Sequence, residues 1–407
     1  MTTDPALGNG LASDGRLTRR TMLAWSSAGV LTVLGGGLLA ACGDDDDAEN
    51  PVSSNDQGAA STASSSNATS RVVELLSTPG PTFTNGPGAV AEAMGFYRDE
   101  GIELSLEYPG NSVRGLQTLV GGTETIASAD SFALLVAVAE DLAFTSIYLG
   151  ARGYAFGFAV NGSSPIQEWS RETVQGTRIG ITEFAGGEVP VLRGALARLG
   201  LAEGGDGVEF VAIGTGGPET ADAIESGSVD IIAASVFDFE IFRAAGVDVR
   251  VITPDYIQSF PGHGYATTPD LLESNRDALV RLLRAKAKGT VFLRANPQAA
   301  AEMAIAAAPA SAEGIPVELV AGFLEGRFGD GNAFAFEDGN PDFHRLGVQD
   351  PAAFDDYQKF LIETGSEDDD GTTLTAEVEV DTIIDNSLID EINDFDYAEI
   401  EALAERS

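Results

Sequence analysis

Short apolar runs alternate with amphipathic stretches over most of this chain. Residues 72–76 (VVELL) form an apolar run that ends at a Thr-Pro-Gly-Pro cluster, and a run of this length bounded by turn residues is typical of a buried strand. Residues 89–100 then carry apolar side chains at helical spacing, and residues 102–106 alternate as a half-buried strand does. The alternation continues to residue 160 and predicts a parallel, doubly wound α/β sheet.

A second strand–helix series follows the Gly-Ser-Ser-Pro cluster at residues 162–165 and continues to residue 252. A break followed by a repeated series indicates a second sheet, so we expect two lobes. Past Pro254 the pattern changes to long helical stretches, over residues 271–295, 297–308, 317–328, 351–364 and, in an acidic tail, 386–406. The predicted boundaries are residues 71–161 and 256–407 for lobe 1 and residues 162–255 for lobe 2.

The N-terminal segment follows a different pattern. Arg19 and Arg20 precede a weakly apolar stretch over residues 22–41, in which serines and glycines lower the hydropathy below that of a membrane span. These features predict an export signal of the twin-arginine type over residues 1–41. Leu39-Ala40-Ala41-Cys42 resembles a bacterial lipobox, and Cys42 is the only cysteine of the chain. We therefore expect lipidation at Cys42; the alternative is a buried cysteine at the end of an ordinary hydrophobic helix.

The next segment, residues 42–70, is rich in Asp, Ser, Ala and Asn and almost lacks large apolar side chains. Such a composition buries too little surface to offset chain entropy, so we expect a disordered tether. One or two acyl chains hold a protein at the bilayer surface without spanning it. The predicted location is the extracytoplasmic face of the cell membrane, with the protein anchored by lipid.

The formal net charge of −40 and the absence of common catalytic motifs exclude several classes of protein. Such a charge repels nucleic acid, and the chain lacks the phosphate-binding loop of an ATPase and the Gly-x-Ser-x-Gly motif of a hydrolase. With only His263 and His344, a histidine metal cluster is not expected. Residues Ser366–Glu377 follow EF-hand spacing, but Ser replaces the first Asp, so an acidic surface loop is favoured over a calcium site. We expect no metal and no cofactor.

Three fragments carry a resemblance to a known family. They are residues 95–104 (GFYRDEGIEL), 223–230 (AIESGSVD) and 295–300 (ANPQAA). In their order and spacing they resemble the two-lobed solute-binding proteins of ABC importers, in the class that binds nitrate, sulfonate, taurine and thiamine-pyrimidine precursors. The resemblance implies a type II periplasmic-binding-protein fold with a cleft between the lobes. It also implies two partners, a small-molecule solute and the membrane subunits of an ABC permease; we expect a monomer.

In such a fold the ligand binds outside the carboxyl ends of the strands, where helix N-termini offer free N–H groups. The segments at these positions supply the expected ligand-binding residues: Thr78, Pro79, Gly80, Asp130, Ser131, Phe184, Gly186, Gly187, Glu188, Ser235, Phe237, Asp238, His263 and Tyr265.

Each group of these residues also has a plain structural interpretation. Asp130 and Ser131 are residue types that cap helices, and Gly186 and Gly187 fit an ordinary turn. His263 is compatible with a structural histidine. The aromatic residues among them, Phe184, Phe237 and Tyr265, are compatible with ordinary core packing.

The predicted cleft segments contain aromatic rings and carboxylates but neither Lys nor Arg. This composition favours a flat heterocycle with amino donors, such as an aminopyrimidine, and the protein is then a carrier without catalytic activity. A binder of nitrate, sulfonate or taurine is an alternative. Two further alternatives on the same fold are a pyrimidine-synthesis enzyme, although the cysteine-rich motif of such relatives is absent, and a sensor domain that docks to a membrane kinase.

Overall fold

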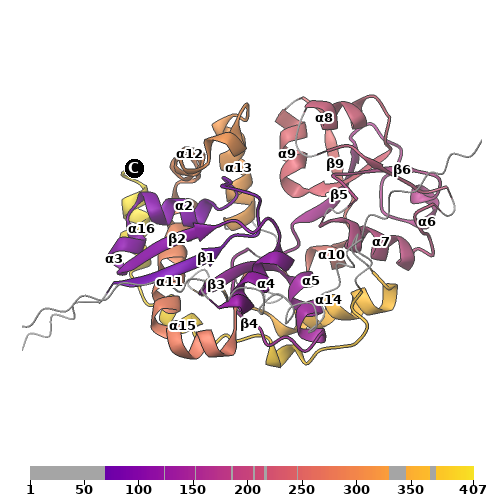
Figure 1. Cartoon of the computed structure of the whole chain (residues 1–407). Coiled ribbons are helices and arrows are strands. Elements are labelled where there is room, and N and C mark those ends of the chain that lie inside the picture. Colours follow the sequence, from indigo (N-terminus) through magenta and orange to yellow (C-terminus); the bar gives the residue numbers. More distant parts are fainter. Residues whose placement is uncertain are drawn as a thin grey trace, which may run out of the picture.

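The computed structural model describes residues 69–407, except residues 123, 152, 185–186, 205–206, 215–217, 245, 330–344 and 367–372. Three N-terminal predictions therefore lie outside the described residues: the export signal, lipidation at Cys42 and nearly all of the tether. The same is true of Gly186, His344 and most of the acidic loop after Ser366. The described residues form two lobes, each built around a five-stranded sheet, as Figure 1 shows.

The first sheet contains strands β1 (Ser70–Leu75), β2 (Ile102–Glu107), β3 (Ile126–Asp130), β4 (Thr145–Leu149) and β10 (His263–Thr267), in the order β2-β1-β3-β10-β4. β1 is parallel to β2 and β3, and β10 is antiparallel to β3 and β4. The carboxyl ends of β1 and β3 therefore open at the same edge of the sheet, where α/β folds place their ligands.

The helices of this lobe are α2 (Gly86–Ala93), α3 (Phe96–Asp99), α4 (Ser112–Gly121) and α5 (Ser131–Ala139). The sequence predicts one helix over residues 89–100, but the structure has two helices there. The break lies at Gly95, whose φ of 76° is left-handed and is available to glycine at little cost.

The second sheet contains β5 (Phe156–Asn161), β6 (Arg178–Ile181), β7 (Glu209–Ala212), β8 (Ile231–Ser235) and β9 (Val249–Val251), in the order β7-β6-β8-β5-β9. Its helices are α6 (Arg171–Val174), α7 (Val189–Arg198), α8 (Pro218–Glu225), α9 (Val236–Ala244) and α10 (Asp255–Gln258). β5 pairs antiparallel with β8 and β9. The chain therefore crosses to the second lobe before β5, whereas the predicted boundary placed residues up to 161 in lobe 1.

The C-terminal part is helical, as predicted, with α11 (Pro269–Ala295), α12 (Pro297–Ala307), α13 (Val317–Phe328) and α14 (Pro351–Thr364). Short 3-10 turns lie at Pro309–Ala312 and Val380–Thr382, and the acidic tail forms α15 (Ile389–Ile392) and α16 (Tyr397–Ala404), two short helices where one was predicted. α11 packs closely on α2 because Gly289 has no side chain: a Cβ there would lie 2.1 Å from the Pro87 carbonyl oxygen.

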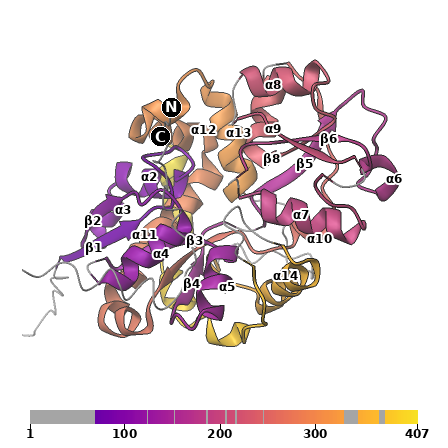
Figure 2. The ribbon, with the colours of Figure 1, turned by 45° about the vertical axis from the view of Figure 1, so that its right-hand side comes forward.

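Helix α14 belongs to the sequence region predicted for lobe 1, but it packs against α7 of the second lobe (Figure 2). Its rings of Tyr357 and Phe360 lie 4.7 and 5.0 Å from the ring of Phe260, centroid to centroid. These residues join an apolar core that continues from the first sheet into the second, so the two lobes share a base. Within the part of the chain that the structure describes, no helix has both the length and the apolar character that a membrane span requires.

Candidate ligand-binding site

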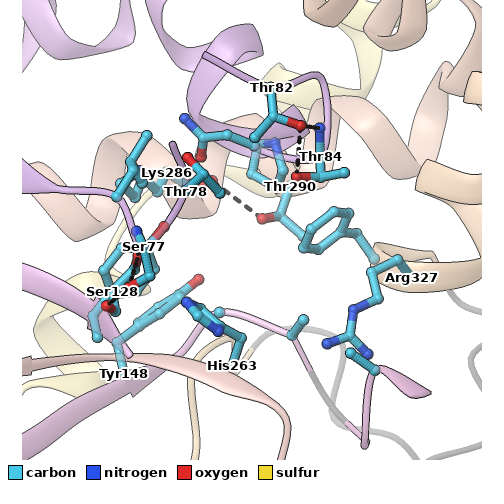
Figure 3. A pocket seen from close by; sticks show the side chains of 18 of the residues that line it. Ser77, Thr78, Thr82, Thr84, Ser128, Tyr148, His263, Lys286, Thr290 and Arg327 are labelled. Atoms are coloured by element: carbon cyan, nitrogen blue, oxygen red, sulfur yellow. Dashed lines mark hydrogen bonds between the residues drawn. The ribbon is translucent and has the colours of Figure 1, made fainter. Parts of the chain in front are cut away.

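A cavity of about 270 Å³ lies beside the carboxyl ends of β1 and β3. Most of its lining comes from the first lobe, and Ala155 and Ser235 reach it from the second. Its polar lining residues are Ser77, Thr78, Thr82, Thr84, Asn85, Ser128, Ser235, His263, Lys286, Thr290 and Arg327. Its apolar and aromatic walls are Leu76, Pro87, Tyr148, Gly150, Ala151, Ala155, Tyr265, Phe323 and Phe328. Figure 3 shows Lys286 and Arg327 at opposite ends of the cavity.

One wall of the cavity is a set of hydroxyl groups from the segment between β1 and α2 and from Ser128 of β3. Ser77 N donates to Ser128 Oγ at 2.9 Å, and Ser77 Oγ donates to the Ser128 carbonyl, so the ends of β1 and β3 are tied together. Thr78 Oγ1 donates to Gly80 O at 2.8 Å. The hydroxyls of Thr82 and Thr84 lie 3.1 Å apart. A hydroxyl both donates and accepts, so this wall can match a ligand edge that carries either kind of group.

A buried ion pair lies at one end. Lys286, on α11, is 3% exposed, and its Nζ lies 2.9 Å from Oε1 of Glu74, on β1, which is fully buried. The ammonium lies 5.0 Å from the ring centroid of Tyr265 and 6.0 Å from that of Tyr97. Burial lowers the pKa of Lys286, but Glu74 and the two tyrosines outweigh it, so the pKa lies well above its ordinary value. The lysine is therefore charged at neutral pH, and Glu74 offsets that charge.

His263 and Arg327 lie toward the other end. Burial lowers the pKa of His263 below 6.5, with Arg327 acting in the same direction and Asp130 against it, so the imidazole is neutral at pH 7. Burial also lowers the pKa of Arg327 to about 10, which leaves the guanidinium charged. Its Nη1 donates to Gly153 O at 3.0 Å, so it is held against the segment that leads into the second lobe.

Of the residues expected from sequence to bind ligand, the cavity brings together Thr78, Ser235, His263 and Tyr265. Asp130 caps α5 instead, because its Oδ1 accepts from Ala133 N at 2.9 Å. The Ser131 hydroxyl donates to Gly262 O at 2.9 Å. Pro79 and Gly80 follow Thr78 in the same loop but do not line the cavity.

The remaining expected residues lie in the second lobe, outside the cavity lining. Glu188 is 1% exposed, and its Oε1 accepts from Thr182 N at 2.8 Å and from the Thr182 hydroxyl. Asp238 Oδ2 accepts from Ser235 N at 3.1 Å, and burial raises its pKa to about 6. Gly187 O accepts from the Tyr154 hydroxyl at 2.7 Å. Phe184 is 43% exposed.

Phe237, also expected to bind ligand, lies beside the cavity but is not one of the residues that line it. Phe237 is the second residue of α9. Its ring centroid lies 5.0 Å from that of Phe83 and 4.4 Å from that of Phe323. Phe83 and Phe323 belong to the first lobe, so the Phe237 ring joins the two lobes beside the cavity. It is the one residue of the second lobe in the core cluster of the first, among the described residues.

Comparisons with known proteins now identify the family, because the family model described as "NMT1/THI5 like" matches residues 84–300, more than half of the chain. The chain belongs to the NMT1/THI5-like family. The riboflavin-binding protein RibY of Chloroflexus aurantiacus is 23% identical to this NMT1/THI5-like chain over 239 residues. That alignment covers 58% of the chain and 66% of RibY, slightly less than two thirds of its length.

Solved structures place this NMT1/THI5-like protein in the type II periplasmic-binding-protein fold. The alkanesulfonate-binding protein SsuA of Xanthomonas axonopodis pv. citri, bound to MOPS, matches with a TM-score of 0.53 at 13% identity, over 79% of this chain and 99% of that one. The nitrate-binding protein NrtA of Synechocystis PCC 6803 matches with a TM-score of 0.54 at 15% identity, over 80% and 89%. At these identities the likeness establishes the fold.

Sequence reasoning missed the two cations of the cavity in this NMT1/THI5-like protein, Lys286 and Arg327. Both come from C-terminal helices, far along the chain from the strand ends that define the cleft. One signal was present: Glu74 interrupts the apolar run of residues 72–76, and a charge buried inside a strand requires a partner. No group of three or more His, Cys, Asp or Glu side chains within the described residues is placed to hold a metal ion.

Proposed function

We propose that this protein is the solute-binding component of an ABC importer and that its ligand is a small, flat, aromatic heterocycle held in the cavity between the lobes. The family and the fold support a carrier role. The observation that carries the proposal is the cavity itself, which lies at the carboxyl ends of β1 and β3 and is completed by Ala155 and Ser235 from the other lobe. A ligand that touches both lobes stabilises the closed arrangement by its differential affinity.

The size and lining of the cavity favour a heterocycle over a small anion. Its volume of about 270 Å³ lies just below the roughly 300–1,000 Å³ of sites for drug-sized ligands, so one or two rings fill it and nitrate leaves most of it empty. Tyr148, Tyr265 and Phe323 supply aromatic walls. The sequence likeness to RibY, which does not depend on the structure, also supports a heterocyclic ligand.

The cavity contains positive charges that the sequence analysis did not expect, but a heterocycle is still favoured over an anion. That reasoning rested on the absence of Lys and Arg from the predicted cleft segments, whereas the cavity contains Lys286 and Arg327. Glu74 offsets the charge of Lys286, so that end of the cavity is neutral overall. The alternative ligand, a nitrate- or sulfonate-type anion, would depend on Arg327.

Native mass spectrometry of the protein purified from its own cells tests the proposal. We expect a bound compound with the mass and ultraviolet absorbance of an aromatic heterocycle. Calorimetry with riboflavin, lumichrome, cytosine, taurine and nitrate then ranks the classes. Tight binding of taurine or nitrate without any binding of the heterocycles would reject the ligand assignment, and a released product that differs from the added compound would indicate an enzyme.

The N-terminal assignments belong to the same proposal. The twin-arginine signal exports the protein, the diacylglycerol on Cys42 anchors it, and the acidic tether lets the monomeric two-lobed part reach its permease. Replacing Cys42 with Ser should move the protein from the membrane fraction to the soluble fraction after cell lysis. A Cys42→Ser protein that still sediments with membranes contradicts the lipid anchor.

A further inference from the structure

Two side chains that line the cavity, Tyr148 on β4 and His263 on β10, keep their polar atoms available. Within the described part of the chain, the Tyr148 oxygen and the two ring nitrogens of His263 have no hydrogen-bond partner, and none of the three atoms is fully enclosed. Tyr148 is otherwise buried, at 4% exposure. A ligand in the cavity can therefore reach both side chains.

The strand register places these two side chains on one face of the first sheet. β4 and β10 are antiparallel neighbours, and Tyr265 of β10 lies directly opposite Tyr148 of β4. His263 comes two residues before Tyr265, so it lies on the same face and is a diagonal neighbour of Tyr148. Diagonal neighbours are about 7–8 Å apart at their Cα atoms, and long side chains can bridge that separation. Figure 3 shows both side chains on the same side of the cavity.

The two charged groups that act on His263 are hydrogen-bonded to other partners. Asp130 lies opposite His263 on β3, but its Oδ1 accepts from Ala133 N at 2.9 Å, and Arg327 donates to Gly153 O at 3.0 Å. The imidazole is neutral at pH 7 because burial lowers the pKa of His263. A neutral imidazole has one donor and one acceptor, and a phenol hydroxyl also donates and accepts. Together they match a ligand edge on which a donor adjoins an acceptor.

We propose that His263 and Tyr148 are specificity-determining residues, which together select flat heterocycles whose edge carries a donor and an acceptor on adjacent atoms. A ring of the same size without this edge would leave at least one of the two side chains unpaired in the closed cavity, which is unfavourable. This inference deepens the proposed function and rests on it. The competing explanation is a structural role for both residues, in which their removal changes stability and leaves ligand preference unchanged.

The isomers 4-aminopyrimidine and 5-aminopyrimidine form a matched pair of probes. The amino group adjoins a ring nitrogen in the first, whereas a carbon atom separates the two groups in the second, and both compounds are neutral in mildly alkaline buffer. The test variants are Tyr148→Phe, which removes one hydroxyl, and His263→Leu, which removes both ring nitrogens at similar volume. The matched control is Tyr256→Phe, because Tyr256 packs against Phe260 and Phe360 in the shared base and does not line the cavity.

We expect calorimetry to give wild type a preference for 4-aminopyrimidine of about tenfold or more, the range for two hydrogen bonds between neutral groups. Tyr148→Phe and His263→Leu should each reduce that ratio to about threefold or less, and Tyr256→Phe should keep it. His263→Gln, whose amide also donates and accepts, should give an intermediate ratio. Melting curves verify that each variant is folded. If His263→Leu does not fold, Tyr148→Phe and His263→Gln decide the test.

Three outcomes overturn the inference. The first is an unchanged ratio in the folded Tyr148 and His263 variants, which would assign both residues a structural role. The second is a wild type that binds the two isomers equally. The third is a wild type that binds neither isomer but takes another compound of the panel, which leaves the carrier role intact. If no compound binds and none is recovered from cells, the proposed function fails as well, so the two failures are distinguishable.

Discussion

Replacing Phe237 with Leu should weaken the closed arrangement of the two lobes. The Phe237 ring projects from α9 of the second lobe and packs edge-on against Phe83 and Phe323 of the first, at centroid distances of 5.0 and 4.4 Å. All three rings are at least nine-tenths buried. Leucine retains most of the apolar volume, so the change removes chiefly the two ring–ring contacts.

The magnitude follows from those two contacts. An aromatic pair contributes about 0.5–1.5 kcal/mol beyond the area that it buries, so two pairs favour closure by about 1–3 kcal/mol. A ligand held between the lobes requires closure, and its dissociation constant should rise by a factor of about 5 to 150. Small-angle scattering of the ligand-free variant should give a larger radius of gyration than wild type. Calorimetry with the compound recovered from cells should give the weaker binding.

Phe242→Leu is the matched control, because Phe242 lies in the same helix and is fully buried, but it packs inside the second lobe against Phe239. It should lower the melting temperature of the second lobe while leaving the radius of gyration of the folded protein unchanged. Equal radii and equal dissociation constants for wild type and Phe237→Leu would refute the reasoning. Such a result would mean that the shared base, which includes α14, is sufficient to hold the lobes together.

Three further changes have expected outcomes in urea denaturation. Lys286→Met alone should cost about 3–5 kcal/mol, since it leaves Glu74 buried without its partner, and adding Glu74→Gln should recover most of that loss; equal stability of the single and double variants would contradict the ion pair. Gly289→Ala should cost about 1–3 kcal/mol, because its Cβ would lie 2.1 Å from Pro87 O, and a neutral effect would contradict the close approach of α11 and α2. Burial raises the pKa of Asp238 from 3.8 to about 6, so its contribution to stability is greatest at low pH and declines as the pH rises from about 4 to 6. Asp238→Asn should therefore stabilise the protein by about 1–3 kcal/mol at pH 8 and by less at pH 4.5; the same difference at both pH values would contradict the raised pKa.

Helices were predictable from sequence where their ends carry local signals. The predicted stretches at 317–328 and 351–364 coincide with α13 and α14. Asp350 caps α14, Pro351 begins it, and the left-handed Gly365 ends it. Proline is favoured at the first position of a helix and glycine just after its end. Long-range pairing has no such signal. Residues 156–161 read as a strand in either lobe, and only their hydrogen bonds to β8 and β9 place them in the second sheet.

The candidate site divides in the same way. Thr78 and His263 could be expected in the cavity because they adjoin strand ends, and the topology of an α/β sheet brings strand ends together. Lys286 could not be placed by that rule, because it lies in the middle of α11, and which face of a long helix meets the sheet depends on packing. The sequence nevertheless contained an indirect signal for a buried cation. A carboxylate inside a buried strand is unfavourable without a cation nearby, so Glu74 required a basic residue from some other element, and α11 supplies it. An unexplained charge within a predicted core strand is therefore a useful guide to the hidden side of a ligand site.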